Sequence, residues 1–128
     1  MSPIANMLVQ LKNAQQAGRE DVVVPFSKMK LEIAKVLKDK GFVAEVEKKT
    51  QKGKKVEHNI LSIKLNGGIG GINLVSKPSR KMYAGKSDLK LVRSGFGIAV
   101  VSTSKGIMAG EDAKKAGIGG EVLFEIWQ

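Results

Sequence analysis

Apolar residues recur at helical spacing in two segments near the N-terminus. In the first segment, Ser2 and Pro3 are typical of a helix start, and Gly18 can end the helix. In the second, Ser27 is the expected N-cap and Gly41 the expected stop. The positions predicted to face the core are Ile4, Met7, Leu8, Leu11, Ala14, Met29, Ile33, Val36 and Leu37. The remaining faces of the second helix carry Lys28, Lys30, Lys35 and Lys38.

Short β-branched or alternating runs predict the strands. In the N-terminal half these are residues 22–24, 42–48 and 56–65, and Pro25 should end the pairing of the first. Residues 48–55 contain five lysines and predict a hairpin tip, which is either a solvated turn or a finger that binds phosphates. In the C-terminal half, strands are expected at 72–75, 81–83, 98–102 and 121–127, and short helices at 87–92 and 111–116.

The order of these elements predicts an α+β fold built from two small α/β domains. Residues 66–71 hold four glycines and cannot support a regular element well. We therefore expect an N-terminal α-β-α-β-β domain at 1–66, a Gly-rich linker at 67–71, and a mainly β C-terminal domain with short helices at 72–128.

Charge narrows the choice of partner. The 128-residue chain has 22 Lys and Arg against 12 Asp and Glu, a formal net charge of +10, which favours a polyanion. Only Arg19, Arg80 and Arg93 are arginine, and lysine suits neutralisation of a phosphate backbone better than bidentate reading of bases. No apolar run is long enough to span a bilayer and the start does not resemble a signal peptide, so we expect a cytoplasmic protein without a membrane partner.

The chain offers little for catalysis or cofactor binding. It has no cysteine and a single histidine, His58, which excludes cysteine-based zinc sites and Cys–His catalysis. Ser102-Thr103-Ser104-Lys105 matches the S-x-x-K motif of serine acyl-enzymes, but the accompanying S-D-N and K-T-G motifs are absent. We therefore predict no enzymatic activity, no cofactor and no metal, with a small serine hydrolase using Ser102 and Lys105 as the competing hypothesis.

Residues 102–106 place three hydroxyls and an ammonium group where an apolar strand leaves the core. Hydroxyls both donate and accept hydrogen bonds, Lys105 adds a mobile charge, and Gly106 permits a turn or a close approach. Such a loop suits phosphates, sugar hydroxyls and base edges. Structured RNA is the expected target, because a loop rich in hydroxyls can read 2′-hydroxyls in a wide minor groove.

The aromatic residues are consistent with this choice. Tyr83 is the only tyrosine and follows Arg80 and Lys81, so its ring either stacks on a base beside two cations or packs within the protein. The chain lacks the aromatic motif of the sheets that stack single-stranded bases. Shape, sugar hydroxyls and phosphates are therefore the expected contacts.

Residues 97–108 read G-I-A-V-V-S-T-S-K-G-I-M and resemble the signature of the small-subunit ribosomal protein eight family. Residues 111–123, the terminal Trp127, the start 2–8 and the middle segment 75–83 resemble the same family. The resemblance implies two small α/β domains. It also implies a structural constituent of the small ribosomal subunit that binds the central domain of its RNA and aids folding and assembly.

The same resemblance implies partners and a location. The partners are small-subunit ribosomal RNA and neighbouring proteins of the subunit such as protein five, and the location is the ribosome in the cytoplasm. Bacterial members of the family also repress translation. The alternative function is therefore a repressor that binds messenger RNA of its own operon through the same surface.

The resemblance gives Thr103, Ser104, Lys105, Gly106 and Tyr83 an RNA-contacting role, with Gly120 and Glu121 next to that surface. With the cationic positions added, the predicted RNA-binding residues are Ser102, Thr103, Ser104, Lys105, Gly106, Tyr83, Arg80, Lys81, Gly120, Glu121, Lys54, Lys55 and Lys30.

This sequence departs from the family pattern in three places, one of which is the unusual Gly-rich segment 66–71. Lys81 stands where the family usually has arginine, and Arg80 replaces an apolar residue. Ala109 and Gly110 replace the usual Thr-Asp pair, which removes the expected cap of the following short helix.

Overall fold

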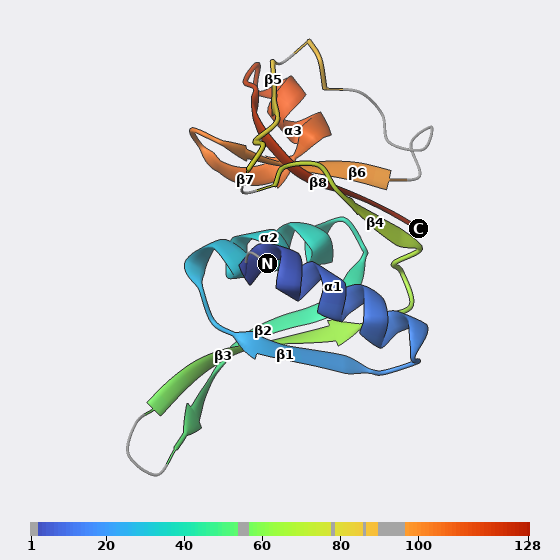
Figure 1. Cartoon of the computed structure of the whole chain (residues 1–128), viewed down its shortest axis with the longest axis vertical. Coiled ribbons are helices and arrows are strands. Elements are labelled where there is room, and N and C mark those ends of the chain that lie inside the picture. The colour runs from blue at the N-terminus through green and yellow to red at the C-terminus, as the bar shows by residue number, and fades with distance from the viewer. Residues whose placement is uncertain (1–2, 54–56, 78, 86, 90–96) are drawn as a thin grey trace. The chain divides into compact units, whose positions relative to one another are not determined.

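The computed structural model describes residues 3–53, 57–77, 79–85, 87–89 and 97–128 (Figure 1). The chain divides into two compact units, Pro3–Gly68 and Ile69–Gln128. Within the described ranges no helix is both long and apolar enough to cross a membrane.

The first unit is a three-stranded antiparallel sheet with two helices on one face (Figure 1). Its elements are α1 (Pro3–Gln16), β1 (Asp21–Pro25), α2 (Lys28–Asp39), β2 (Val43–Lys52) and β3 (Glu57–Leu65). The strands lie in the order β1-β3-β2, so β3 is central. Val22 and Val24 of β1 pair with Ile63 and Leu61 of β3, and all four side chains are buried, which defines the face under the helices.

Local sequence signals set the start of α2 and the C-terminal ends of α1 and α2 as predicted. The Ser27 side chain accepts a hydrogen bond from the Lys30 backbone N–H at 3.1 Å, which confirms it as the N-cap of α2. Gly18 and Gly41 follow the two helices with φ of 72° and 85°, in the left-handed region that glycine adopts freely. Ser2 lies outside the described residues. Of the predicted core positions, Met7, Leu8, Leu11, Ala14, Ile33 and Leu37 are buried, and Ile4, Met29 and Val36 are half-buried.

Lys30 is predicted on a face of α2 away from the buried stripe, and this prediction is wrong. It is only 7% exposed and lies in the buried stripe with Ile33, Ala34 and Leu37, the spacing of a single helix face. Its Nζ donates to the Pro25 backbone oxygen at 3.1 Å, which satisfies the ammonium group inside the unit.

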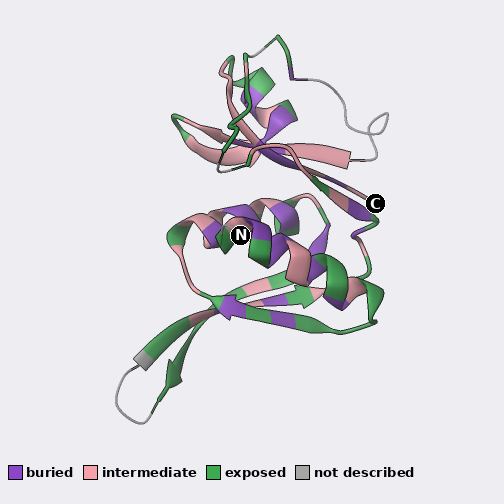
Figure 2. Cartoon of the chain, viewed as in Figure 1, coloured by how far each residue is buried: buried purple, intermediate pink, exposed green. Residues whose placement is uncertain are grey.

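The lysine-rich segment 48–55 is also corrected in part. β2 continues to Lys52 and pairs with β3 as far as Glu57, so residues 48–52 form a strand, not a turn. Residues 47–53 are exposed, and this end of the ribbon projects beyond the helices (Figures 1 and 2). A ribbon exposed on both faces has no apolar alternation, so hydrophobic periodicity does not reveal it. Lys54 and Lys55 lie outside the described residues.

In its described residues, the second unit is a five-stranded antiparallel sheet with one short helix. Its elements are β4 (Gly71–Leu74), β5 (Tyr83–Ala84), β6 (Gly97–Thr103), β7 (Gly106–Ala109), α3 (Gly110–Lys115) and β8 (Gly120–Trp127). The order is β4-β8-β6-β7, and β5 pairs with the start of β8. On one face, Val101 forms a buried cluster with Leu89 and with Ala113 of α3.

The predicted α+β class is confirmed, but three short elements of the second unit differ from the sequence analysis. The strand expected at 81–83 is reduced to Tyr83–Ala84. Residues 87 and 88 form a turn where a helix was expected at 87–92, and residues 90–92 lie outside the described part. The strand β7 was not predicted, because its four residues continue a hairpin whose turn was read as the end of the strand.

Candidate nucleic-acid interface

A two-residue turn, Ser104-Lys105, joins β6 to β7, with Thr103 and Gly106 as the closing pair. The Thr103 hydroxyl donates to the Gly106 carbonyl oxygen at 2.7 Å and accepts from the Lys105 backbone N–H at 3.1 Å. Gly106 has a φ of 109°, which a side chain rarely tolerates. Thr103 and Gly106 therefore shape the turn, and the exposed side chains of Ser104 and Lys105 are left to meet a ligand.

Register brings three of the predicted residues side by side. Ser102 of β6 and Tyr83 of β5 are both paired with Glu121 of β8, so the three form one row across three strands. Directly paired residues share a face of the sheet. Because Val101 packs under α3 and side chains alternate, this row lies on the face opposite α3. Tyr83 is 71% exposed, and Ser102 and Glu121 are half-buried.

Glycines at the start of β8 allow this row to form. A Cβ built on Gly120 would overlap the Ser102 carbonyl oxygen, and one on Gly119 would overlap that of Ala84. Any side chain at either position would push β8 away from its neighbours. Gly120 therefore supports the row through its backbone.

The segment before β5 carries the predicted cations. Lys77 and Arg80 form an isolated bridge, each backbone N–H donating to the other's carbonyl oxygen at 2.9 Å. Arg80, Lys81 and Tyr83 are all exposed. Ser76, which the sequence analysis missed, hydrogen bonds to the Val122 carbonyl oxygen and to the Met82 N–H. The sequence signals at this position are a polar residue directly after the predicted strand 72–75 and its place in the segment 75–83 quoted for the resemblance, and neither identifies these partners.

The structure thus gathers most of the predicted residues into the second unit. They are Ser102, Thr103, Ser104, Lys105, Gly106, Tyr83, Arg80, Lys81, Gly120 and Glu121. Lys30 belongs to the first unit and is buried, and Lys54 and Lys55 fall outside the described residues.

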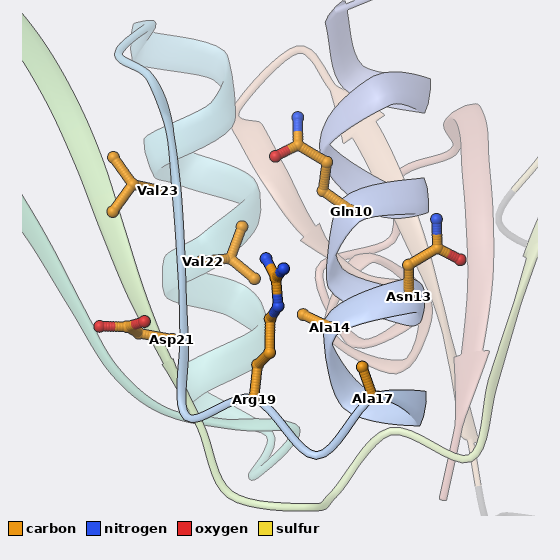
Figure 3. A pocket seen from close by; sticks show the side chains of 8 residues that line it. All are labelled: Gln10, Asn13, Ala14, Ala17, Arg19, Asp21, Val22 and Val23. Carbon is orange, nitrogen blue, oxygen red and sulfur yellow. The ribbon is translucent and has the colours of Figure 1, made fainter.

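A hollow in the first unit offers no comparable chemistry. It lies between α1 and β1, where the Arg19 side chain extends beside Val22 and Ala14 (Figure 3). One cation and one carboxylate, Asp21, line it together with amide and small apolar side chains. Among the described residues, no group of three His, Cys, Asp or Glu side chains is placed to hold a metal ion.

Comparison with known proteins gives one consistent result. The model of the family described as ribosomal protein S8 matches residues 2–127. Curated relatives named small ribosomal subunit protein uS8 include one from Caldicellulosiruptor bescii, 44% identical over 99% of this chain and 98% of its own length. Those from Acidithiobacillus ferrooxidans (45% identical, 94% of this chain and 93% of the relative) and Synechococcus sp. (43% identical, 98% and 96%) agree.

Proposed function

The chain belongs to the ribosomal protein S8 family, and from this membership we propose that it is a structural constituent of the small ribosomal subunit. In this role it binds the central domain of small-subunit ribosomal RNA and aids folding and assembly of that domain. Its place of action is the ribosome in the cytoplasm, and its other partners are neighbouring proteins of the subunit, protein five among them. The role is structural, and we assign no catalytic step to it.

The observation that carries the RNA-binding role is the exposed tip of the β6–β7 hairpin beside the row Ser102–Glu121–Tyr83. The Ser104 hydroxyl can donate to a phosphate or accept from a 2′-hydroxyl, and Lys105 can neutralise a phosphate. Both project from a short hairpin within a five-stranded sheet, which limits how far they move. Contacts fixed in this way suit an RNA whose shape is also fixed.

Tyr83 and Glu121 add a different kind of contact. The exposed ring of Tyr83 offers one stacking surface, beside the exposed cations Arg80 and Lys81. Glu121 repels phosphates, so it accepts hydrogen bonds from base amino groups or sugar hydroxyls. One stacking ring flanked by hydroxyls and a carboxylate fits a folded helix with an accessible base better than an extended single strand.

The test is footprinting and equilibrium binding of the full chain on small-subunit ribosomal RNA from the same organism. We expect protection confined to one irregular helix of the central domain, and much weaker binding to a scrambled RNA of equal length. Equal affinity for the two RNAs would contradict the proposal. Competition with leader segments of messenger RNA from the same cell tests the repressor alternative, since a repressor binds such a leader at the same surface.

A further inference from the structure

Residues 77 and 79–83, the described part of the segment before β5, include Arg80, Lys81 and Tyr83 and have little regular structure of their own. The ladder contacts of these described residues are the Lys77–Arg80 bridge and the short strand β5. The described residues from Lys77 to Tyr83 are all exposed, so no buried side chain anchors them. Apart from the pairing of β5 with β8, the segment therefore depends on individual hydrogen bonds to stay against the sheet.

One hydroxyl connects both ends of this segment to β8. The Ser76 Oγ donates to the Val122 carbonyl oxygen at 2.7 Å and accepts from the Met82 backbone N–H at 2.9 Å. Met82 also bonds directly to β8: its carbonyl oxygen accepts a hydrogen bond from the Val122 N–H at 2.8 Å. Met82 directly precedes Tyr83, and Val122 directly follows Glu121.

The position of Ser76 is itself fixed by an irregularity of β8. The register between β6 and β8 shifts between Val100 and Val101, which leaves Leu123 as the extra residue. The Leu123 carbonyl oxygen accepts from the backbone N–H groups of both Val75 and Ser76, at 3.1 and 3.3 Å. Ser76 therefore sits at the bulge, with its hydroxyl between β8 and the returning segment.

A hydroxyl suits this place because it has one hydrogen to donate and lone pairs to accept. Both capacities are used here, and alanine would leave the Met82 N–H and the Val122 carbonyl oxygen without this partner. Water can restore the hydrogen bonds at this partly exposed site, but a water molecule does not fix the distance between the strands.

We propose that Ser76 is a positioning residue for RNA recognition: it sets where Tyr83 lies relative to Glu121 and Ser102 without touching RNA itself. This inference rests on the proposed function, since the contacts that Ser76 positions are those assigned to RNA. Its role differs from that of Lys81 or Tyr83, because it acts through the backbone of Met82.

The first experiment measures equilibrium binding of the full-length chain and its variants to the central-domain RNA. Ser76→Ala should weaken binding about tenfold, because two hydrogen bonds that hold the segment are lost. Ser76→Thr keeps the hydroxyl and should stay within about twofold of the parent. Ser79→Ala, a change of the same size at an exposed position of the same segment, should leave affinity unchanged.

A purely structural loss is separated from positioning by two further variants. Ile126→Val removes one buried methylene group elsewhere in the same sheet and lowers stability without touching this segment. At a temperature where both variants are folded, only Ser76→Ala should weaken binding. In a Tyr83→Ala background the effect of Ser76→Ala should shrink to about twofold or less, since the ring it positions is absent.

A spectroscopic measurement on the free protein completes the test. Tyr83 is the only tyrosine, so its ring resonances report the segment without interference. Ser76→Ala should shift these resonances and speed hydrogen exchange at the Met82 amide, and Ser76→Thr should restore both. Unchanged resonances, or an affinity loss that persists in full without Tyr83, would overturn the inference. Failure of the parent chain to bind the RNA would instead overturn the proposed function.

Discussion

In the turn between β6 and β7, neighbouring residues have different roles: one stabilises the turn and the next two face solvent. The hydroxyl of Thr103 is used within the turn, where it bonds to Gly106 and Lys105. Ser104 and Lys105 are exposed and available to a ligand. The sequence shows three hydroxyls in a row and does not distinguish them, because the distinction depends on the closing pair of the hairpin.

Lys105→Ala should weaken RNA binding and reduce the salt dependence of log K by about one unit of slope, because one phosphate contact is lost. Lys114→Ala is the matched control, since Lys114 is an exposed lysine on α3, which covers the other face of the sheet. Binding measured at several salt concentrations checks both. A slope that does not respond to Lys105→Ala, or responds equally to both changes, would argue against the assignment.

Ser104→Ala should cost about 1 kcal/mol of RNA binding free energy and leave the free energy of unfolding unchanged, because its hydroxyl has no role in the turn. Thr103→Ala should show the opposite pattern and mainly lower the free energy of unfolding, because it removes both hydrogen bonds that the Thr103 hydroxyl makes within the turn. Titration calorimetry with RNA and urea unfolding of the free chain distinguish the two. An equal loss on a scrambled RNA would show that Ser104 does not discriminate.

At the scale of elements, the pairing of β4 with β8 depends on a glycine that leaves room for a neighbouring side chain. Gly71 pairs with Trp127, and a Cβ at Gly71 would lie 2.5 Å from the indole ring. Gly71→Ala should therefore destabilise the protein by about 1–3 kcal/mol, since the indole or the strand must move. Gly110→Ala, whose added Cβ would meet its nearest neighbour at 3.6 Å, should be neutral or stabilising. Circular dichroism during thermal unfolding measures both, and equal melting temperatures would refute the expectation.

The sequence predicts those elements whose signals are local. Ser27 and Gly41 bound α2 because a cap and a left-handed residue are encoded at single positions. The extended ribbon of β2 and β3 and the short strand β7 depend on pairing with a distant or newly formed partner, and apolar periodicity does not report pairing. Residue type and spacing conflict at Lys30, because a lysine is typical of a solvated face although its spacing matches the buried stripe.

The candidate site, too, depends on long-range pairing that local sequence signals do not report. Tyr83, Glu121 and Ser102 were each selected individually, but their common row follows from register across three strands and from a bulge at Leu123. The role of Ser76 does not show in the sequence, because its partners are 46 residues away at Val122 and six away at Met82. Long-range register is set by the whole sheet and is invisible in a local window.

At the scale of the molecule, cationic charge extends well beyond the hairpin. Lys48, Lys49 and Lys52 lie on the exposed end of the β2–β3 ribbon. Lys48 Nζ is 4.5 Å from the centre of the Phe26 ring and Lys49 Nζ is 3.7 Å from a Glu47 carboxylate oxygen, so neither charge is fully free for a phosphate.

We also propose, as the sequence predicts, that residues 67–71 form the linker between the two domains.

Replacing Lys48, Lys49 and Lys52 together by alanine should lower affinity for target and scrambled RNA by the same factor, with a salt slope reduced by about two units. The reason is that lysines on a solvated ribbon neutralise phosphates without reading bases. Tyr83→Ala is the contrasting variant, since it should weaken binding to the target alone. Filter binding of both RNAs decides the matter, and a loss confined to the target after the lysine changes would contradict this view.

The packing of Trp127 against Gly71 has a practical consequence. Trp127 is the only tryptophan of the chain, so a natural fluorophore sits on the contact that joins the first and last strands of the second unit. Its emission should follow the opening of that contact during unfolding or assembly, and no dye has to be attached near the surface assigned to RNA.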